Sequence, residues 1–243
     1  MERDVVISVN GLNKTFYERN TINNLFRKKR KAHHAIKDLS FEVYRGEIFG
    51  IIGRNGSGKS TLLKILLGGM PADQPGCVEV DGKVMRMALG MGFNSNLSAR
   101  DNIYINGSIL GLSFKEIGNR FQKIIDFAEI HDFVDTQIKF YSSGMKSRLA
   151  FAIAIHAEAD IFLLDEFFGG VGDESFKKKS QDAFDDLISH GRTIVLVSHS
   201  LGIIRNNCSR VLILDKGEHI ATGEPEAMVR LYRKTIKLKQ NVK

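Results

Sequence analysis

The sequence predicts an α/β fold in which a parallel β-sheet is covered by helices on both faces. Short apolar runs that indicate buried strands alternate along the chain with helical patterns, as this architecture requires. One of these runs leads through a glycine-rich loop directly into a helix. The pattern turns helical over residues 97–156, and this stretch is predicted to be an insertion on the sheet core.

The N-terminal part of the chain predicts two strands separated by a loop. Residues 5–9 favour a strand, and residues 39–44 alternate apolar and polar side chains as a second strand would. Between them, residues 17–34 are polar and are predicted to form an inserted loop. The apolar run at residues 48–52 then predicts a buried strand.

A glycine-rich loop follows this strand and matches the pattern G-x-x-x-x-G-K-[ST], which is typical of loops that bind nucleoside phosphates. The glycines allow backbone N–H groups to form a nest for anionic oxygens, and the helix predicted to begin near Lys59 adds its positive end. We expect Lys59 to reach the β- and γ-phosphates and the Ser60 hydroxyl to ligate Mg²⁺. The predicted binding residues are Gly53, Asn55, Gly56, Ser57, Gly58, Lys59, Ser60 and Thr61.

Two short strand candidates and a helix follow the loop. The strands are predicted at residues 77–80 and 84–89, and the dipeptide Asp81-Gly82 between them is typical of a hairpin turn. Over residues 114–128, apolar side chains recur at helical spacing with charged side chains opposite them. This stripe is most simply explained by packing of a helix against the core.

A second helix start carries small residues that suit an anion. Tyr141, Ser142, Ser143, Gly144 and Met145 precede an apolar helical pattern that extends to Ile155. Small residues at a helix start expose backbone N–H groups. Considered alone they form an N-cap and a turn, but together with the phosphate-binding loop they predict a second phosphate-binding helix end.

Two acidic residues end the buried strand predicted at residues 161–164. Asp165 is expected to hold Mg²⁺, directly or through water, because a carboxylate at a strand terminus is suited to that ion. The adjacent Glu166 is expected to orient and deprotonate the attacking water as general base.

His199 follows another predicted strand, at residues 194–197. Ligand-facing groups of a parallel sheet lie at the carboxyl ends of its strands, so His199 is expected to hydrogen-bond the γ-phosphate. A helix is predicted at residues 176–188, and two strands at residues 211–214 and 219–222 are joined by a turn.

Charge and composition restrict the partners. The net charge is +7, and basic residues concentrate in the tail at residues 230–243 and in one inserted cluster. That cluster consists of Arg27, Lys28, Lys29, Arg30 and Lys31. Basic segments of this kind contact anionic lipid headgroups or nucleic acid, or they are simply solvated loops and chain termini. No nucleic-acid-binding motif accompanies them, so nucleic acid is not predicted as a partner. No apolar run reaches the length of a membrane span. The two cysteines lie far apart in the sequence, which indicates a reducing compartment.

The motifs, taken in order, resemble the nucleotide-binding subunit of an ABC transporter from about residue 5 to about residue 229. The resemblance identifies Gly53 to Ser60 as Walker A, Tyr141 to Met145 as the signature, Asp165 as the end of Walker B and His199 as the switch histidine. It implies a P-loop NTPase with a RecA-like parallel sheet core, an N-terminal antiparallel β subdomain and an inserted helical signature subdomain. The single domain, residues 1–243, then divides into a core at about 1–93 and 157–229, helices at about 94–156 and a basic tail at about 230–243.

The resemblance also implies ligands and partners. ATP and Mg²⁺ are the expected cofactors, and two copies are expected to bind two ATP molecules head to tail, each signature serving the other copy's nucleotide. Asp173 is expected at the dimer seam, and Asn94 occupies the position of the usual glutamine. Phe16 is expected to stack on adenine, with Tyr17 as the alternative. Membrane permease subunits are the second expected partner, which places the chain at the cytoplasmic face of the cell membrane.

Finer features resemble exporters of bacterial surface polysaccharides, namely O-antigen, capsule and teichoic acid. The signature reads Tyr-Ser-Ser-Gly-Met, the usual Pro-Thr after Glu166 is missing, and residues 98–107 are distinctive. The alternatives are an ABC subunit for a lipid, a drug or a small solute, or a soluble ABC-type ATPase acting on ribosomes or DNA. The single phosphate loop and the lack of sustained heptads disfavour the soluble class.

Overall fold

The computed structural model describes residues 4–17, 32–87, 92–165 and 174–240. It divides into two compact units, which are described separately. One unit consists of Met1–Val84 with Thr193–Lys243, and the other of Met85–Arg192. This grouping assigns residues 157–192 to the unit that holds the helices, whereas the sequence-based division assigns them to the core. The division into a core and a helical subdomain therefore stays a prediction.

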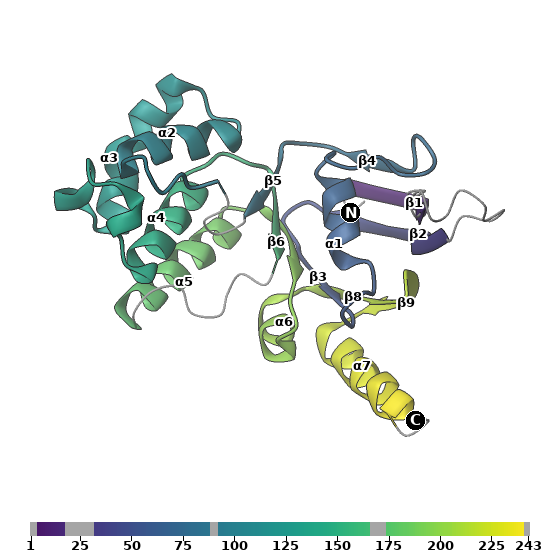
Figure 1. Ribbon diagram of the computed structural model, residues 1–243. Coiled ribbons are helices and arrows are strands. Elements are labelled where there is room, and N and C mark those ends of the chain that lie inside the picture. The colour runs from purple at the N-terminus through teal and green to yellow at the C-terminus, as the bar shows by residue number, and fades with distance from the viewer. Residues whose placement is uncertain (1–3, 18–31, 88–91, 166–173, 241–243) are drawn as a thin grey trace, which may run out of the picture. The chain divides into compact units, whose positions relative to one another are not determined.

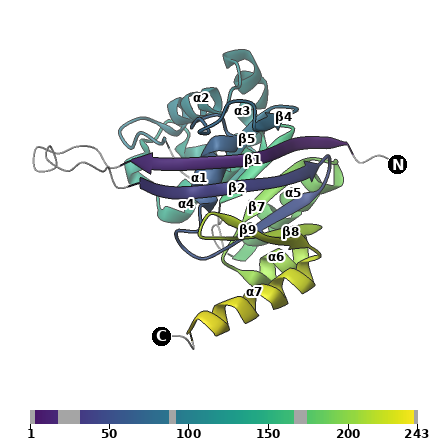
Figure 2. The same ribbon diagram turned by 90° about the vertical axis from the view of Figure 1, so that its right-hand side faces the viewer.

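The first unit begins with a three-stranded antiparallel sheet in the order β2-β1-β4. Its strands are β1 (Val5–Tyr17), β2 (Ala32–Tyr44) and β4 (Val78–Val80). Figure 2 shows β1 and β2 side by side along their length. The loop predicted at residues 17–34 ends earlier in the structure than expected. His33 and His34 already belong to β2 and pair with Phe16 and Thr15 of β1.

The prediction of a hairpin around Asp81-Gly82 is wrong, because the strands on its two sides do not pair with each other. β4 pairs with β1 in the register Ile7↔Val80, and the Asp81 N–H continues this ladder by donating to the Val6 carbonyl at 2.9 Å. The next strand, β5 (Val84–Met87), belongs to a different sheet. The local turn signal is overridden because β4 finds its partner in a strand about seventy residues earlier in the chain.

A second sheet of the first unit carries the strand that feeds the glycine-rich loop. β7 (Thr193–Val197), β3 (Ile48–Ile52) and β8 (Arg210–Asp215) are neighbours and parallel, and β9 (Glu218–Gly223) adds to β8 as an antiparallel hairpin. Every residue of β3 and β7 is buried, as their unbroken apolar runs predict. The helices of this unit are α1 (Lys59–Leu66), α6 (Leu201–Asn207) and α7 (Pro225–Gln240).

The second unit is mostly helical, which confirms the helical pattern expected from residue 97 onward. It contains α2 (Ala99–Ile109), α3 (Phe114–Ala128), α4 (Ser143–Ile155) and α5 (Glu174–Ser189) beside strands β5 and β6 (Ile161–Asp165). Capping boxes start α2 at Ser98 and α3 at Ser113. The helices α2, α3 and α4 pack on one another (Figure 1). Within the described ranges, no helix combines the length and the apolar character that crossing a bilayer requires.

Candidate functional site

The glycine-rich loop is held tightly between β3 and α1. A Cβ atom on Gly53 would lie 2.2 Å from the Leu214 carbonyl oxygen, and one on Gly58 would lie 2.5 Å from the Ala35 carbonyl oxygen. Gly58 also has a φ of +107°, which side-chain-bearing residues rarely adopt. The Gly217 N–H donates to the Ser57 carbonyl at 2.9 Å and anchors the loop to the β8–β9 turn. Close approach of the backbone therefore requires glycine at positions 53 and 58 of the motif.

Lys59 begins α1 with its side chain buried against this loop. Only 7% of the residue is exposed, and Nζ donates to the carbonyl oxygens of Gly53 at 2.7 Å and Arg54 at 3.1 Å. Ser57 is buried, and its Oγ has no hydrogen-bond partner among the described residues. Asn55, Gly56 and Ser60 are exposed, whereas Thr61 is half-buried. A buried ammonium within a loop at a helix N-terminus is an arrangement that favours an anion.

Gly58→Ala is expected to lower the free energy of unfolding by about 2–4 kcal/mol, because both φ and the Ala35 carbonyl exclude a methyl group. Gly56→Ala is the matched control. Gly56 has a φ of +77° but open space around its Cβ position, so it should lose only about 1 kcal/mol. Urea unfolding measures both variants, and equal losses would contradict the packing of the loop described above.

His199 lies at the same sheet edge as the loop. β3 and β7 are parallel with Ile51 opposite Val197, so Gly53 and His199 both follow the carboxyl ends of adjacent strands. His199 is exposed, and the Ser200 N–H next to it donates to Ser198 Oγ at 3.1 Å. The predicted position at a strand end is confirmed, and the bond to a γ-phosphate stays a prediction.

The two candidates for adenine stacking lie at the end of β1. Phe16 is 38% exposed, and the Lys14 ammonium is 5.7 Å from the centre of its ring. Tyr17 is 63% exposed. Successive side chains of a strand point to opposite faces, so only one of these rings faces any given ligand. Both remain candidates.

The signature segment builds the start of α4. Ser142 is the N-cap, and its Oγ accepts a hydrogen bond from the Met145 N–H at 3.1 Å. Tyr141 is buried and its hydroxyl donates to the Phe133 carbonyl at 2.6 Å, while burial raises the pKa of this phenol to about 12. Ser143 is exposed at the first helical position, and the first turn contains no acidic residue. Tyr141 and Ser142 thus shape a helix start that presents Ser143 and Gly144 to solvent.

Asp165 ends β6, as the sequence predicts, but it has a partner that the sequence did not suggest. The Arg86 guanidinium on β5 donates through Nη2 to Asp165 Oδ2 at 2.8 Å. The only signal for Arg86 in the sequence is a charged residue among the apolar neighbours Val84, Met85 and Met87. Three expected features, namely Glu166, Asp173 and the basic cluster from Arg27 to Lys31, lie outside the described residues.

Asn94 lies in an exposed turn before α2 and has a local structural role. Its Oδ1 accepts from the Asn96 N–H at 3.0 Å, and its own N–H donates to Asn102 Oδ1 at 2.8 Å. Asn102 is fully buried and returns a bond from Nδ2 to the Asn94 carbonyl at 3.1 Å. Asn102, which sequence reasoning missed, therefore fixes the Asn94 turn to α2.

The oxygen donors predicted for the metal suit Mg²⁺ in chemical type. Ser60 supplies a hydroxyl at the start of α1 and Asp165 a carboxylate at the end of β6. In the part of the chain that the structure describes, no three His, Cys, Asp or Glu residues gather as a metal cage. Mg²⁺ in nucleotide sites commonly has one or two protein ligands and completes its shell with phosphate and water oxygens, so each of the two donors is of a chemical type that such a site uses.

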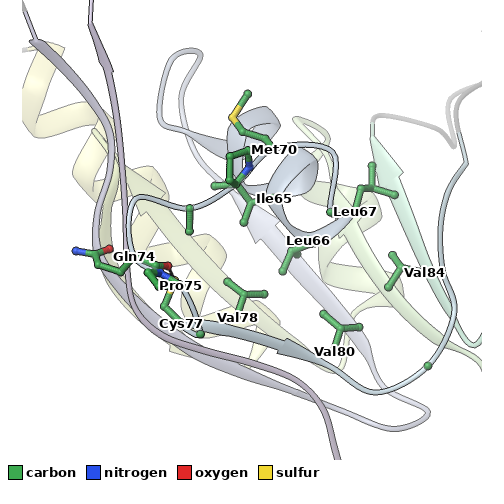
Figure 3. A pocket seen from close by; sticks show the side chains of 15 residues that line it. Ile65, Leu66, Leu67, Met70, Gln74, Pro75, Cys77, Val78, Val80 and Val84 are labelled. Carbon is green, nitrogen blue, oxygen red and sulfur yellow. Dashed lines mark hydrogen bonds between the residues drawn. The ribbon is translucent and has the colours of Figure 1, made fainter.

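A separate pocket of about 730 Å³ lies in the first unit between the end of α1 and β4 (Figure 3). Apolar side chains line much of it, including Ile65 and Leu66 of α1 and Val78 and Val80 of β4. None of the residues 53–61 contributes to its wall. The pocket is therefore distinct from the phosphate-binding loop.

The sequence was compared with protein families and with known proteins, and both comparisons identify ABC transporter proteins as relatives. The sequence profile of the family described as "ABC transporter" matches residues 36–169. The chain is 44% identical over 209 residues to the ABC transporter protein AbcA of Aeromonas salmonicida, covering 85% of this chain and 67% of the relative. It is 42% identical to the teichoic acids export ATP-binding protein TagH of Lactococcus lactis, over 86% of this chain and 44% of that protein. It is also 42% identical to the O-antigen export system ATP-binding protein RfbB of Myxococcus xanthus, over 84% of this chain and 46% of that protein.

Solved structures show the same fold at lower identity. A dimeric post-hydrolysis state of the ATP-binding cassette MJ0796, bound to ADP and phosphate, matches with a TM-score of 0.70 and 21% identity. The match covers 90% of this chain and 98% of the cassette. The chain spans about half the length of the TagH and RfbB relatives. By sequence profile, by relatives and by fold, the chain belongs to the ABC transporter family.

Proposed function

We propose that this chain is the ATP-binding and ATP-hydrolysing subunit of an ABC exporter that moves a surface polysaccharide across the cytoplasmic membrane through a separate permease. The buried Lys59 within the glycine-rich loop is the observation that carries the ATPase proposal. The polysaccharide class is supported by the names of two relatives, which are described as export proteins for teichoic acids and O-antigen.

In this proposal, the residues of the loop bind the triphosphate of ATP. Its backbone N–H groups and the Lys59 ammonium stabilise the charge on the transferred phosphoryl group. Ser60 and Asp165 would hold Mg²⁺, and the bound ion would offset part of the phosphate charge. Glu166 takes the proton of the attacking water, and His199 hydrogen-bonds the γ-phosphate. Phe16 or Tyr17 stacks on adenine.

A second copy completes each site. The helix start around Ser143 of one copy faces the γ-phosphate that is bound by the other copy, and Asp173 lies at the seam between them. The exposed N-terminus of α4, with no acidic residue in its first turn, supports this role. ATP then has higher affinity for the closed dimer than for the open one, and this difference drives closure. Hydrolysis and phosphate release open the dimer.

The permease docks on the helical unit near the Asn94 turn. Large apolar side chains of this unit are exposed, including Ile109 at 66%, Phe114 at 72% and Phe140 at 72%. Exposed apolar groups of this size are suited to a protein partner. Through the permease the chain is held at the cytoplasmic face of the membrane. The positive charges of Arg27 to Lys31 favour contact of this cluster with anionic lipid headgroups.

The test of this function is a deletion strain complemented with plasmid copies. Loss of the gene should remove a polysaccharide from the cell surface. Its lipid-linked precursor should accumulate on the cytoplasmic side of the membrane. The parental gene should restore export, whereas the Glu166→Gln gene should not, at equal protein level. A deletion strain with normal surface polysaccharide would contradict the proposed substrate class.

A further inference from the structure

We propose that Arg86 is a positioning residue that neutralises Asp165, and that it thereby determines how strongly nucleotide binding depends on Mg²⁺. The inference rests on the proposed function, in which Asp165 is the carboxylate that ligates the Mg²⁺ of bound ATP. Arg86 is outside every motif considered above, and it lies on β5, 79 residues before Asp165.

The pair is shielded from water. Nη2 of Arg86 is 2.8 Å from Oδ2 of Asp165, and the two side chains are only 27% and 22% exposed. On β5, Met85 and Met87 are buried while Arg86 alternates with them. An arginine side chain keeps its charge at all relevant pH values, and a charge pair that is mostly out of water is weakly screened by salt. Asp165 therefore has a permanent positive neighbour.

The contact engages one oxygen of the carboxylate. Arg86 donates to Oδ2, and its Nε is buried with no hydrogen-bond partner among the described residues. By contrast, Arg100 on α2 forms a two-point contact with Asp135, at 2.7 Å and 3.2 Å. An arginine that holds a carboxylate by one oxygen leaves the other oxygen available to a metal or its water.

The charge of Arg86 should matter most when no metal is bound. Without Mg²⁺, Asp165 carries a negative charge that repels a bound triphosphate, and the guanidinium cancels this repulsion. With Mg²⁺, the charge of the metal would offset the charge of the Asp165 carboxylate, so the guanidinium would no longer be needed to cancel it. Removal of the Arg86 charge should therefore weaken metal-free binding more than it weakens metal-dependent binding.

The test is the Kd of a fluorescent, non-hydrolysable ATP analogue, measured once in EDTA and once in saturating Mg²⁺. The ratio of interest is the Kd in EDTA divided by the Kd in Mg²⁺. For Arg86→Gln, this ratio should rise about tenfold above the parental ratio. Arg86→Lys, which keeps the charge, should stay within about threefold. Arg100→Gln is the matched control, because it removes a guanidinium from an exposed Arg–Asp pair, and it should leave the ratio unchanged. A ratio in Arg86→Gln that is equal to or below the parental ratio would overturn the inference.

Asp165→Asn separates this inference from the proposed function. The substitution should bring the ratio close to one, and a parental ratio in this variant would show that the metal assignment of Asp165 has failed. If Asp165→Asn behaves as expected and Arg86→Gln does not, only the role of Arg86 is refuted. Arg86→Met repeats the test if Arg86→Gln unfolds.

Discussion

Replacing Glu166 by glutamine is expected to lower the rate of ATP turnover by about a hundredfold or more while ATP binding is kept. Glutamine has nearly the same shape as glutamate but cannot accept the proton of the attacking water. Because hydrolysis is what opens the dimer in the proposed cycle, the variant should accumulate as a stable ATP-bound dimer. Steady-state phosphate release measures the rate, and size-exclusion chromatography with ATP detects the dimer.

The control for this variant is Glu79→Gln, which removes the same charge from an exposed position on β4. Its turnover should equal that of the parental protein. If Glu166→Gln hydrolyses ATP at the parental rate, Glu166 is not the base and the proton must go elsewhere.

Lys59→Ala should weaken ATP binding by about a hundredfold, because hydrogen bonds from a charged donor in a buried site contribute up to about 3 kcal/mol. The ammonium is already within the loop, bonded to the Gly53 and Arg54 carbonyl oxygens. A bound triphosphate would therefore meet a positive charge that is largely desolvated. Equilibrium binding of labelled ATP measures the loss.

Lys64→Ala provides the comparison for Lys59→Ala. Lys64 lies in the last turn of the same helix and is exposed, so its removal changes the net charge equally but should leave ATP affinity unchanged. Equal losses in the two variants would mean that only overall charge matters, which would contradict the direct role of Lys59. Thermal unfolding of both proteins excludes a loss of fold as the cause.

The parts of the site that lie within one short segment could be predicted from the sequence. The glycine-rich loop and the N-cap of α4 are local, so the spacing of Gly58, Lys59 and Ser142 is sufficient to indicate their geometry. The position of His199 could be predicted as well, because the ends of adjacent parallel strands meet at one edge of a sheet.

Features that depend on distant partners could not be predicted in this way. Asp81-Gly82 is typical of a hairpin, yet β4 pairs with β1, because side-chain packing across strands outweighs the local turn preference. The Arg86–Asp165 pair joins two strands by a contact that no spacing in the sequence encodes. Asn102 likewise reaches back to the Asn94 turn from a helix whose pattern indicates only packing.

The claim that two copies share each nucleotide can be tested with a mixture of two defective variants. Lys59→Ala removes the phosphate-binding lysine, and Ser143→Arg blocks the start of α4, so neither variant should dimerise with ATP by itself. In the mixture, the intact loop of the Ser143→Arg copy can meet the intact α4 start of the Lys59→Ala copy. Native mass spectrometry of the two variants in the Glu166→Gln background should then show a heterodimer that holds one ATP. If no heterodimer forms, or if the Ser143→Arg copy dimerises alone with ATP, the shared site is refuted.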